Sequence, residues 1–254
     1  MSSKRSFCVF FCLLCLLASS AAFAASAPQK YVVGIDGDYP PYSFMGADGK
    51  PTGFDVESIR WIARNGGFEV EIKPVAWDGI IPALLAKKID MVYSGMTASE
   101  ERKKVVAFSM VYWEIDQAVT VKNDSKITMD DVLKGKVSIG TQRGCTAAHW
   151  LEDNLVKKNI LKKDKFRLYD NFPIAAKDLE IGRIDAAMMD DMIVANVIKG
   201  KPLKVIGTVK TGEEYAVAMR KEDKELHEKI NEGLKKLMAS PKWEELKKKY
   251  DMQK

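Results

Sequence analysis

Short apolar runs alternate with amphipathic helical segments along most of this 254-residue sequence, and the alternation restricts the chain to an α/β fold built in layers. The expected strands of the first half lie at 31–35, 68–73 and 89–93, and its expected helices at 53–64, 80–87 and from 97 onward. A second series begins near residue 117, with expected strands at 118–121, 137–141, 166–169 and 185–189 and helices at 146–158, 173–181 and 192–199.

The two series of expected strands and helices share one short sequence pattern. Residues 88–92 and 183–187 both follow a helix, contain Ile-Asp and lead into a polar turn, which favours two α/β halves of similar plan. After residue 210 we expect one more strand, at 215–219, and two charged helices with apolar residues at helical spacing. This tail is too small for a domain, so it is expected to pack back on the first half. The expected lobes are 25–111 with 216–254, and 117–210, joined by hinge crossings at 112–116 and 211–215.

The N-terminus has the pattern of a secretory signal peptide. Lys4 and Arg5 precede an apolar run at 8–18 that is too short to span a bilayer comfortably, and Ala22-Phe23-Ala24 forms an A-x-A site. We therefore predict a signal peptide at 1–24, cleavage before Ala25 and a periplasmic location. The alternative is a retained membrane anchor.

Net charge and cysteine content argue against nucleic-acid binding and against an internal disulfide. The formal charge of +5 falls to +3 without Lys4 and Arg5, and a balance this near neutral argues against nucleic-acid binding. Of the four cysteines only Cys145 lies beyond the signal peptide, so no internal disulfide is expected. About 230 residues remain, enough for one large domain or two lobes.

No catalytic motif is present. The sequence lacks a P-loop, a G-x-G-x-x-G loop and a nucleophile elbow. His149 and His227 are isolated on helical patterns, and Cys145 has no evident histidine partner. We therefore expect no catalytic residue, no metal and no cofactor.

Acidic and aromatic residues gather where expected strands end. Segment 36–44 combines aspartates with aromatic residues after the first strand, Trp77 follows the second strand, and segment 94–102 follows the third. Ligands of open α/β sheets bind outside the carboxyl ends of the strands. These segments are therefore expected to line one crevice.

These segments resemble the periplasmic amino-acid-binding proteins of ABC transporters, the family-3 solute-binding group. The likeness covers nearly all of residues 30–251 and is carried by 36–44, 53–56, 77–84, 95–97, 139–146, 182–186 and Tyr250. Each piece is weak alone, but their order and spacing together are specific. The resemblance implies a two-lobed periplasmic-binding-protein fold of type II, with a double hinge and a ligand cleft between the lobes.

The resemblance also implies how an α-amino acid is held. Arg102 corresponds to the residue that grips the α-carboxylate, since its planar fork matches two oxygens, and Thr97 and Thr146 add contacts. Asp190 receives the α-ammonium group, with the carbonyl of Gly95. Without the resemblance, the alternative interpretation of Arg102 is a solvent-exposed charge on a helix. For the ammonium contact, the alternative to Asp190 is Asp191.

Tyr39 and Trp77 correspond to the aromatic residues that sandwich the ligand side chain. Specificity is assigned to Asp36, Gln142, Met96, Met189 and Glu114. Cys145 stands where the family often has Ser or Thr, which puts its carboxylate contact in doubt, and Met189 offers no strong hydrogen bond. Acidic residues suit a basic ligand and Gln142 suits an amide, whereas an acidic ligand lacks a second cation unless Arg143 turns inward.

The predicted function is the extracytoplasmic binding component of an ABC transporter, a monomer that closes on a polar or basic L-amino acid and docks on permease subunits. One alternative is a periplasmic dehydratase acting on prephenate or arogenate, which needs an acid in the cleft such as Glu114 or Asp190. A second alternative is a ligand-binding sensor protein.

Overall fold

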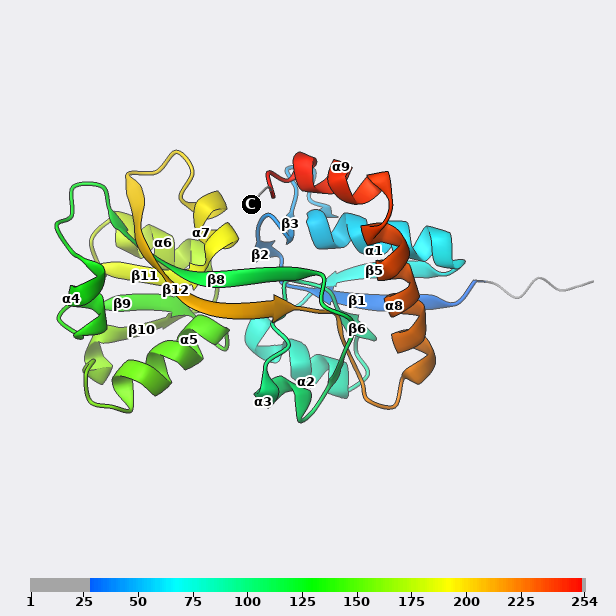
Figure 1. The fold of residues 1–254 in the computed structure, drawn as a ribbon, viewed down its shortest axis with the longest axis horizontal. Helices are drawn as coiled ribbons and strands as arrows, with labels where there is room; N and C mark the ends of the chain where they lie inside the picture. The colour runs from blue at the N-terminus through cyan, green and yellow to red at the C-terminus, as the bar shows by residue number, and fades with distance from the viewer. Residues whose placement is uncertain (1–27, 253–254) are drawn as a thin grey trace, which may run out of the picture.

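The computed structural model describes residues 28–252 and contains two five-stranded sheets, each flanked by helices (Figure 1). The predicted signal peptide lies outside the described residues. The first sheet has the order β5-β1-β6-β13-β7, formed by Glu69–Pro74, Lys30–Ile35, Met91–Val92, Ala218–Met219 and Ala107–Phe108. Strand β1 is parallel to β5 and β6, and β13 is antiparallel to β6 and β7.

The second sheet has the order β10-β9-β11-β8-β12, formed by Phe166–Tyr169, Ile139–Gln142, Ala186–Asp190, Trp113–Lys122 and Leu203–Tyr215. Strands β10, β9 and β11 are parallel, and β8 is antiparallel to both of its neighbours. All five residues of β11 are buried, as expected of a central strand covered on both faces. The mixed strands and helices confirm the predicted α/β fold.

Two long strands connect the lobes. Strands β8 and β12 pair antiparallel from Trp113 opposite Tyr215 to Lys122 opposite Leu203, and they run side by side between the two halves (Figure 1). The sequence pattern did not predict β12 before residue 215. This strand is the edge of its sheet and most of its residues are at least partly exposed, so Lys, Thr and Gly replace the apolar alternation of an inner strand.

The first lobe, defined as the first sheet and its helices, contains α1 (Phe54–Gly66), a 3-10 turn η1 (Trp77–Gly79), α2 (Ile80–Leu85), α3 (Glu100–Lys103), α8 (Lys224–Met238) and α9 (Pro241–Lys249). Helix α1 ends where Gly67 adopts the left-handed conformation (φ 69°) and donates its N–H to Ala63. Helix α8 buries four apolar residues, spaced three or four apart, and both α8 and α9 pack on α1.

The second lobe, defined as the second sheet and its helices, contains α4 (Met129–Leu133), α5 (Thr146–Leu151), η2 (Glu152–Val156), η3 (Lys163–Lys165), α6 (Phe172–Glu180) and α7 (Asp191–Val197). The helix expected at 146–158 is α-helical only to Leu151 and continues as the π-helical turn η2. In the first lobe, a small sheet of β2 (Asp38–Tyr39), β3 (Ser43–Met45) and β4 (Pro51–Thr52) occupies part of the expected loop after β1. Among the helices within residues 28–252, none is both long enough and apolar enough to cross a bilayer.

Candidate functional site

The candidate site lies between the lobes, at the carboxyl ends of the parallel strands. Asp36 directly follows β1, Gln142 ends β9 and Asp190 ends β11. Side chains from the two lobes meet there directly, since Gln142 Nε2 donates to Asp36 Oδ2 at 2.7 Å and the Tyr39 hydroxyl donates to Asp190. Strand ends from two separate sheets therefore meet in one region between the lobes, as expected for α/β proteins.

Arg102 is a buried cation of the first lobe. The Ser99 hydroxyl caps α3 by accepting the Arg102 N–H at 3.3 Å, and Arg102 is the third of the four residues of this helix. Its guanidinium donates to the carbonyl oxygens of Thr97 and Gly144, both at 3.1 Å. Only 8% of the residue is exposed, so it is not a solvated helix charge. Burial lowers the pKa of Arg102, while nearby groups including Cys145 and Asp190 oppose that shift.

Arg102 also lies against the aromatic pair. The guanidinium carbon is 5.3 Å from the centroid of the Trp77 ring, a cation–π distance. Trp77 stacks nearly parallel on Tyr39, with centroids 6.1 Å apart and planes inclined by 7°, and its indole N–H donates to Gly144 at 3.2 Å. The two predicted aromatic residues thus lie side by side in the first lobe.

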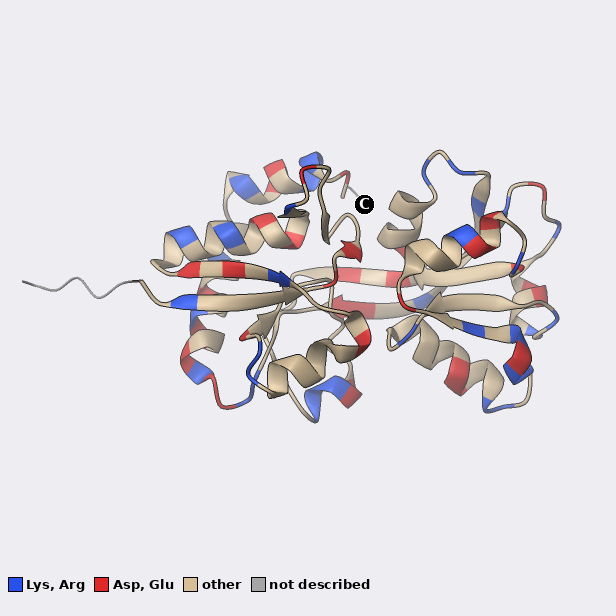
Figure 2. Ribbon diagram, turned by 180° about the vertical axis from the view of Figure 1, so that it is seen from behind, with Lys and Arg blue, Asp and Glu red and all other residues tan. Residues whose placement is uncertain are grey.

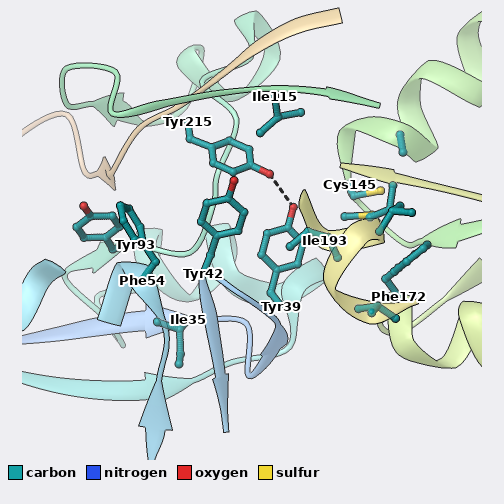
Figure 3. Close-up of a cluster of buried hydrophobic side chains, with 14 of the residues drawn as sticks. Ile35, Tyr39, Tyr42, Phe54, Tyr93, Ile115, Cys145, Phe172, Ile193 and Tyr215 are labelled. Carbon is teal, nitrogen blue, oxygen red and sulfur yellow. Dashed lines mark hydrogen bonds between the residues drawn. The ribbon is translucent and has the colours of Figure 1, made fainter. Parts of the chain in front are cut away.

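Asp190 is the buried anion of the second lobe. Its carboxylate accepts hydrogen bonds from the hydroxyls of Tyr39 and Tyr215 and from Gln117 Nε2, the last at 2.6 Å. Figure 3 shows the hydroxyls of Tyr39 and Tyr215 pointing toward each other, and they lie 3.0 Å apart. Burial raises the pKa of Asp190 to about 6, and the negative charge of Glu213 adds to the rise. Asp191 is the first residue of α7, and its Oδ1 accepts the N–H of Met192.

Asp36 and Gln142 form the other end of the cleft. Burial raises the pKa of Asp36, and the hydrogen bond from Gln142 opposes this shift. Asn171, from the second lobe, donates to Asp38 at 2.9 Å. A hollow of about 330 Å³ opens here, and its lining includes three aspartates, Asp36, Asp38 and Asp170. None of the described residues that line it is Lys or Arg.

Gly95 lies against the rings of Tyr39 and Tyr215 and is held there by a buried acid. Its N–H donates to Asp55 Oδ2 at 2.7 Å, and the Tyr112 hydroxyl donates to the same oxygen at 2.8 Å. Desolvation raises the pKa of Asp55 to about 8. Gly95 has φ +56°, and a Cβ there would stand 2.7 Å from a ring carbon of Tyr39. Met96 is fully buried, and its carbonyl accepts the N–H of Ala216.

Three predicted contacts of the ligand carboxylate have partners within the protein. The Thr97 hydroxyl donates to Glu213 Oε2 at 2.9 Å, and the Thr146 hydroxyl accepts from Gln117 Nε2 at 3.3 Å. Cys145 caps α5, since its sulfur accepts the Ala148 N–H at 3.4 Å. Burial raises the pKa of the Cys145 thiol to about 11.

One residue assigned to specificity, Glu114, lies away from this cluster, whereas three unassigned residues lie within it. Glu114 is exposed and lines a separate hollow with Trp113 and Met238, and Arg143 is also exposed. Met189 is buried, and its sulfur lies 3.9 Å from the Thr141 hydroxyl. The residues that sequence reasoning missed are Gln117, Glu213 and Tyr215. Their sequence surroundings contain no ligand-binding signal, because only strand pairing brings them to the cleft.

No metal centre is present in the described part of the chain. Within residues 28–252, no group of three or more His, Cys, Asp or Glu side chains is placed to hold a metal ion. His149 is exposed, and His227 Nε2 lies 2.8 Å from the carbonyl oxygen of Phe108.

Known proteins resemble the whole of this architecture. Residues 31–253 match the profile of the bacterial extracellular solute-binding proteins, family 3. The L-cystine-binding protein TcyJ of Escherichia coli is 37% identical over 207 residues, which cover 80% of this chain and 75% of the relative. An ancestral arginine-binding protein bound to arginine superposes with a TM-score of 0.81 and 36% identity, covering 87% of this chain and 98% of that structure.

A third similar structure is an ancestral amino-acid-binding protein, AncCDT-1, described as a precursor of cyclohexadienyl dehydratase. Its TM-score is 0.79 and its identity 36%, covering 87% of this chain and 95% of that structure. These likenesses, with the two sheets and the two strands between them, confirm the predicted two-lobed fold.

Proposed function

Because this chain belongs to the bacterial extracellular solute-binding proteins of family 3, we propose that it binds a polar or basic L-amino acid between its lobes. It would act as the monomeric substrate-binding component of an ABC transporter, outside the cytoplasmic membrane, and hand its ligand to the permease subunits. The ligand is held by both ends of its backbone, and its side chain extends toward Asp36 and Gln142.

The observation that carries this proposal is a pair of opposite buried charges from opposite lobes. Arg102 and Asp190 are each less than 9% exposed, and the charge of Asp190 affects the pKa of Arg102. An α-amino acid carries a carboxylate and an ammonium a few ångströms apart, so a cation and an anion on facing walls match its two ends. Arg102 would bind the carboxylate with the N–H of Thr97, and Asp190 would bind the ammonium.

The acidic end of the cleft supports a basic or polar side chain. Asp36, Asp38 and Asp170 line the hollow beside Trp77, and a cationic group there would be attracted by nearby carboxylates. The flat ring of Trp77 stacks on an extended side chain or a guanidinium. The proteins described above whose names mention cystine or arginine are consistent with this class.

Lobe closure is the proposed mechanical step. Direct contacts between lobes include Trp77 to Gly144, Gln142 to Asp36 and Asn171 to Asp38. The paired strand segments 112–116 and 211–215 are the proposed hinges. A ligand that contacts both lobes favours the closed arrangement by its differential affinity, and the closed form is the proposed species that docks on the permease.

A thermal-shift screen of the twenty L-amino acids and of L-cystine tests the proposal. A ligand present at one hundred times its Kd stabilises the folded state by about 2.7 kcal/mol, which corresponds to a rise in Tm of roughly 5–10 °C for a chain of this size. We expect such a shift for arginine, lysine, histidine, glutamine or cystine, and none for aspartate or glutamate. No shift with any amino acid would refute the proposed function.

A second candidate is a dehydratase acting on prephenate or arogenate. It is favoured by the structural likeness to the ancestral precursor of cyclohexadienyl dehydratase and by the raised pKa of Asp190, a buried acid in the cleft. Glu114, the other acid considered, is exposed and lies outside the cleft cluster. Incubation with prephenate or arogenate, followed by absorbance of an aromatic product, separates this activity from binding.

A further inference from the structure

Glu213 is aimed into the cleft by a bulge in one of the strands that connect the lobes. The pairing of β12 with β8 shifts register between Val209 and Glu213. Asp116 holds this bulge, since its Oδ1 accepts the N–H groups of Thr211 and Gly212 at 3.0 and 3.1 Å, and its Oδ2 accepts from Lys210. Bulges commonly redirect a side chain next to a functional site.

The carboxylate of Glu213 connects both sides of the candidate site. Its Oε2 accepts the hydroxyl of Thr97, from the first lobe, and its Oε1 accepts Gln117 Nε2 at 3.0 Å. The same Gln117 nitrogen donates to Asp190 at 2.6 Å. Figure 2 shows acidic residues on both paired strands where they pass between the lobes.

Strand geometry explains why Glu213 and Gln117 meet. Glu213 pairs with Ile115, and side chains two residues apart on a strand lie on one face, so Gln117 and Glu213 are diagonal neighbours. Glu214 is exposed and follows Glu213 on the strand; it also lines the hollow beside Glu213, but its carboxylate accepts a hydrogen bond from neither Thr97 nor Gln117. Glu213 is partly buried and lines a hollow of about 610 Å³ with Thr97, Thr146 and Lys210.

We propose that Glu213 is a positioning residue of the amino-acid site, which orients Thr97 at the carboxylate end and Gln117 and Asp190 at the ammonium end. This role rests on the proposed function. With its hydroxyl proton donated to Glu213, Thr97 presents its backbone N–H to the ligand carboxylate. The Gln117 amide nitrogen donates to both Glu213 and Asp190. Because Glu213 holds this amide in place, Gln117 fixes the orientation in which the Asp190 oxygens face the ligand ammonium.

The charge of Glu213 also acts on Asp190. The titratable groups that interact with Asp190 are Glu213, Arg102, Tyr39, Tyr42, Tyr215 and Cys145. The negative charge of Glu213 adds to the effect of burial and raises the Asp190 pKa. Since an ammonium binds the ionised carboxylate, affinity declines as pH falls through the Asp190 pKa in the free protein. Removing the charge of Glu213 lowers that pKa. The decline in affinity on acidification, called the acid limb below, therefore moves to lower pH.

The test compares Glu213→Gln with the matched control Glu214→Gln, which removes the same charge from the adjacent, exposed position. The titrant is L-arginine, L-lysine, L-histidine, L-glutamine or L-cystine, whichever the thermal-shift screen selects, in calorimetric titrations from pH 4.5 to 8. Glu213 uses one carboxylate oxygen for Thr97 and the other for Gln117, and glutamine replaces one of these acceptors with a donor NH2 group. We expect Glu213→Gln to raise Kd about tenfold at neutral pH, equivalent to about 1.4 kcal/mol, and to move the acid limb to lower pH. Glu214→Gln should match the wild type in both.

A third variant, Glu213→Asp, separates the effect of the negative charge from the effect of side-chain length. It keeps the negative charge but retracts the carboxylate by one methylene, so Kd should rise while the acid limb stays near its wild-type position. If Glu213→Gln fails to fold, wild-type affinity in Glu213→Asp overturns the proposal.

Two further results would overturn this role for Glu213 while leaving amino-acid binding intact. One is wild-type Kd and acid limb in Glu213→Gln. The other is weaker binding with an unmoved acid limb, which indicates a purely structural effect. A wild-type protein that binds no amino acid refutes the proposed function itself, and with it this role.

Discussion

Replacing Arg102 tests the predicted grip on the ligand carboxylate. A guanidinium has five N–H donors, and Arg102 uses two of them on the carbonyl oxygens of Thr97 and Gly144. The others are available for a carboxylate. Two charge-assisted hydrogen bonds are worth about 1.5–3 kcal/mol each, so their loss amounts to about 3–6 kcal/mol. We therefore expect Arg102→Met to raise Kd by about 10²- to 10⁴-fold.

Met keeps an apolar stem against Trp77, which limits the loss of packing. The control is Lys103→Met, because Lys103 lies beside Arg102 on α3 and forms an exposed ion pair with Glu100, a pair worth at most about 1 kcal/mol. Isothermal titration calorimetry measures Kd, and thermal unfolding without ligand checks that both variants fold. An Arg102→Met protein that binds within threefold of the wild type would refute the assignment.

The remaining predictions concern the ligand-free protein. Burial raises the pKa of Asp55 to about 8, well above the ordinary value of an aspartate, so the stability that its protonated form contributes at low pH is lost as pH rises toward 8. Asp55→Asn should therefore flatten the dependence of Tm on pH between 5 and 8, and an unchanged slope would show that Asp55 does not titrate in this window. Gly95→Ala adds a Cβ at φ +56° against Tyr39 and should destabilise the fold by about 1–3 kcal/mol. Gly49→Ala, at φ +72° with open space around it, should lose less stability in the same urea titration, and equal losses would contradict the steric argument. Cys145 is 3% exposed with a pKa of about 11, so in the protein lacking residues 1–24 its thiol should react with a disulfide reagent at pH 8 only after unfolding, whereas rapid reaction of the folded protein would contradict this burial.

Local patterns predicted much of the fold and the candidate site. The periodicity of the apolar residues located most helices and inner strands within a few residues. The edge strand β12 escaped prediction because an exposed strand lacks a continuous apolar pattern. For the site, strand ends indicated which segments meet, but the roles of Tyr39, Trp77, Arg102 and Asp190 came from the family resemblance; the structure places all four in one buried cluster.

The sequence by itself determined which strand ends carry charged and aromatic residues, because helix caps, strand periodicity and motifs are encoded by neighbouring residues. Only the tertiary structure decided what those residues contact. Tyr39 reaches Asp190 across 151 positions, and Thr97 reaches Glu213 across 116. Such contacts depend on how two lobes face each other and on a bulge that Asp116 holds in β12. Gln117, Glu213 and Tyr215 enter the site through strand pairing, and no local pattern reports which residues a distant strand will meet.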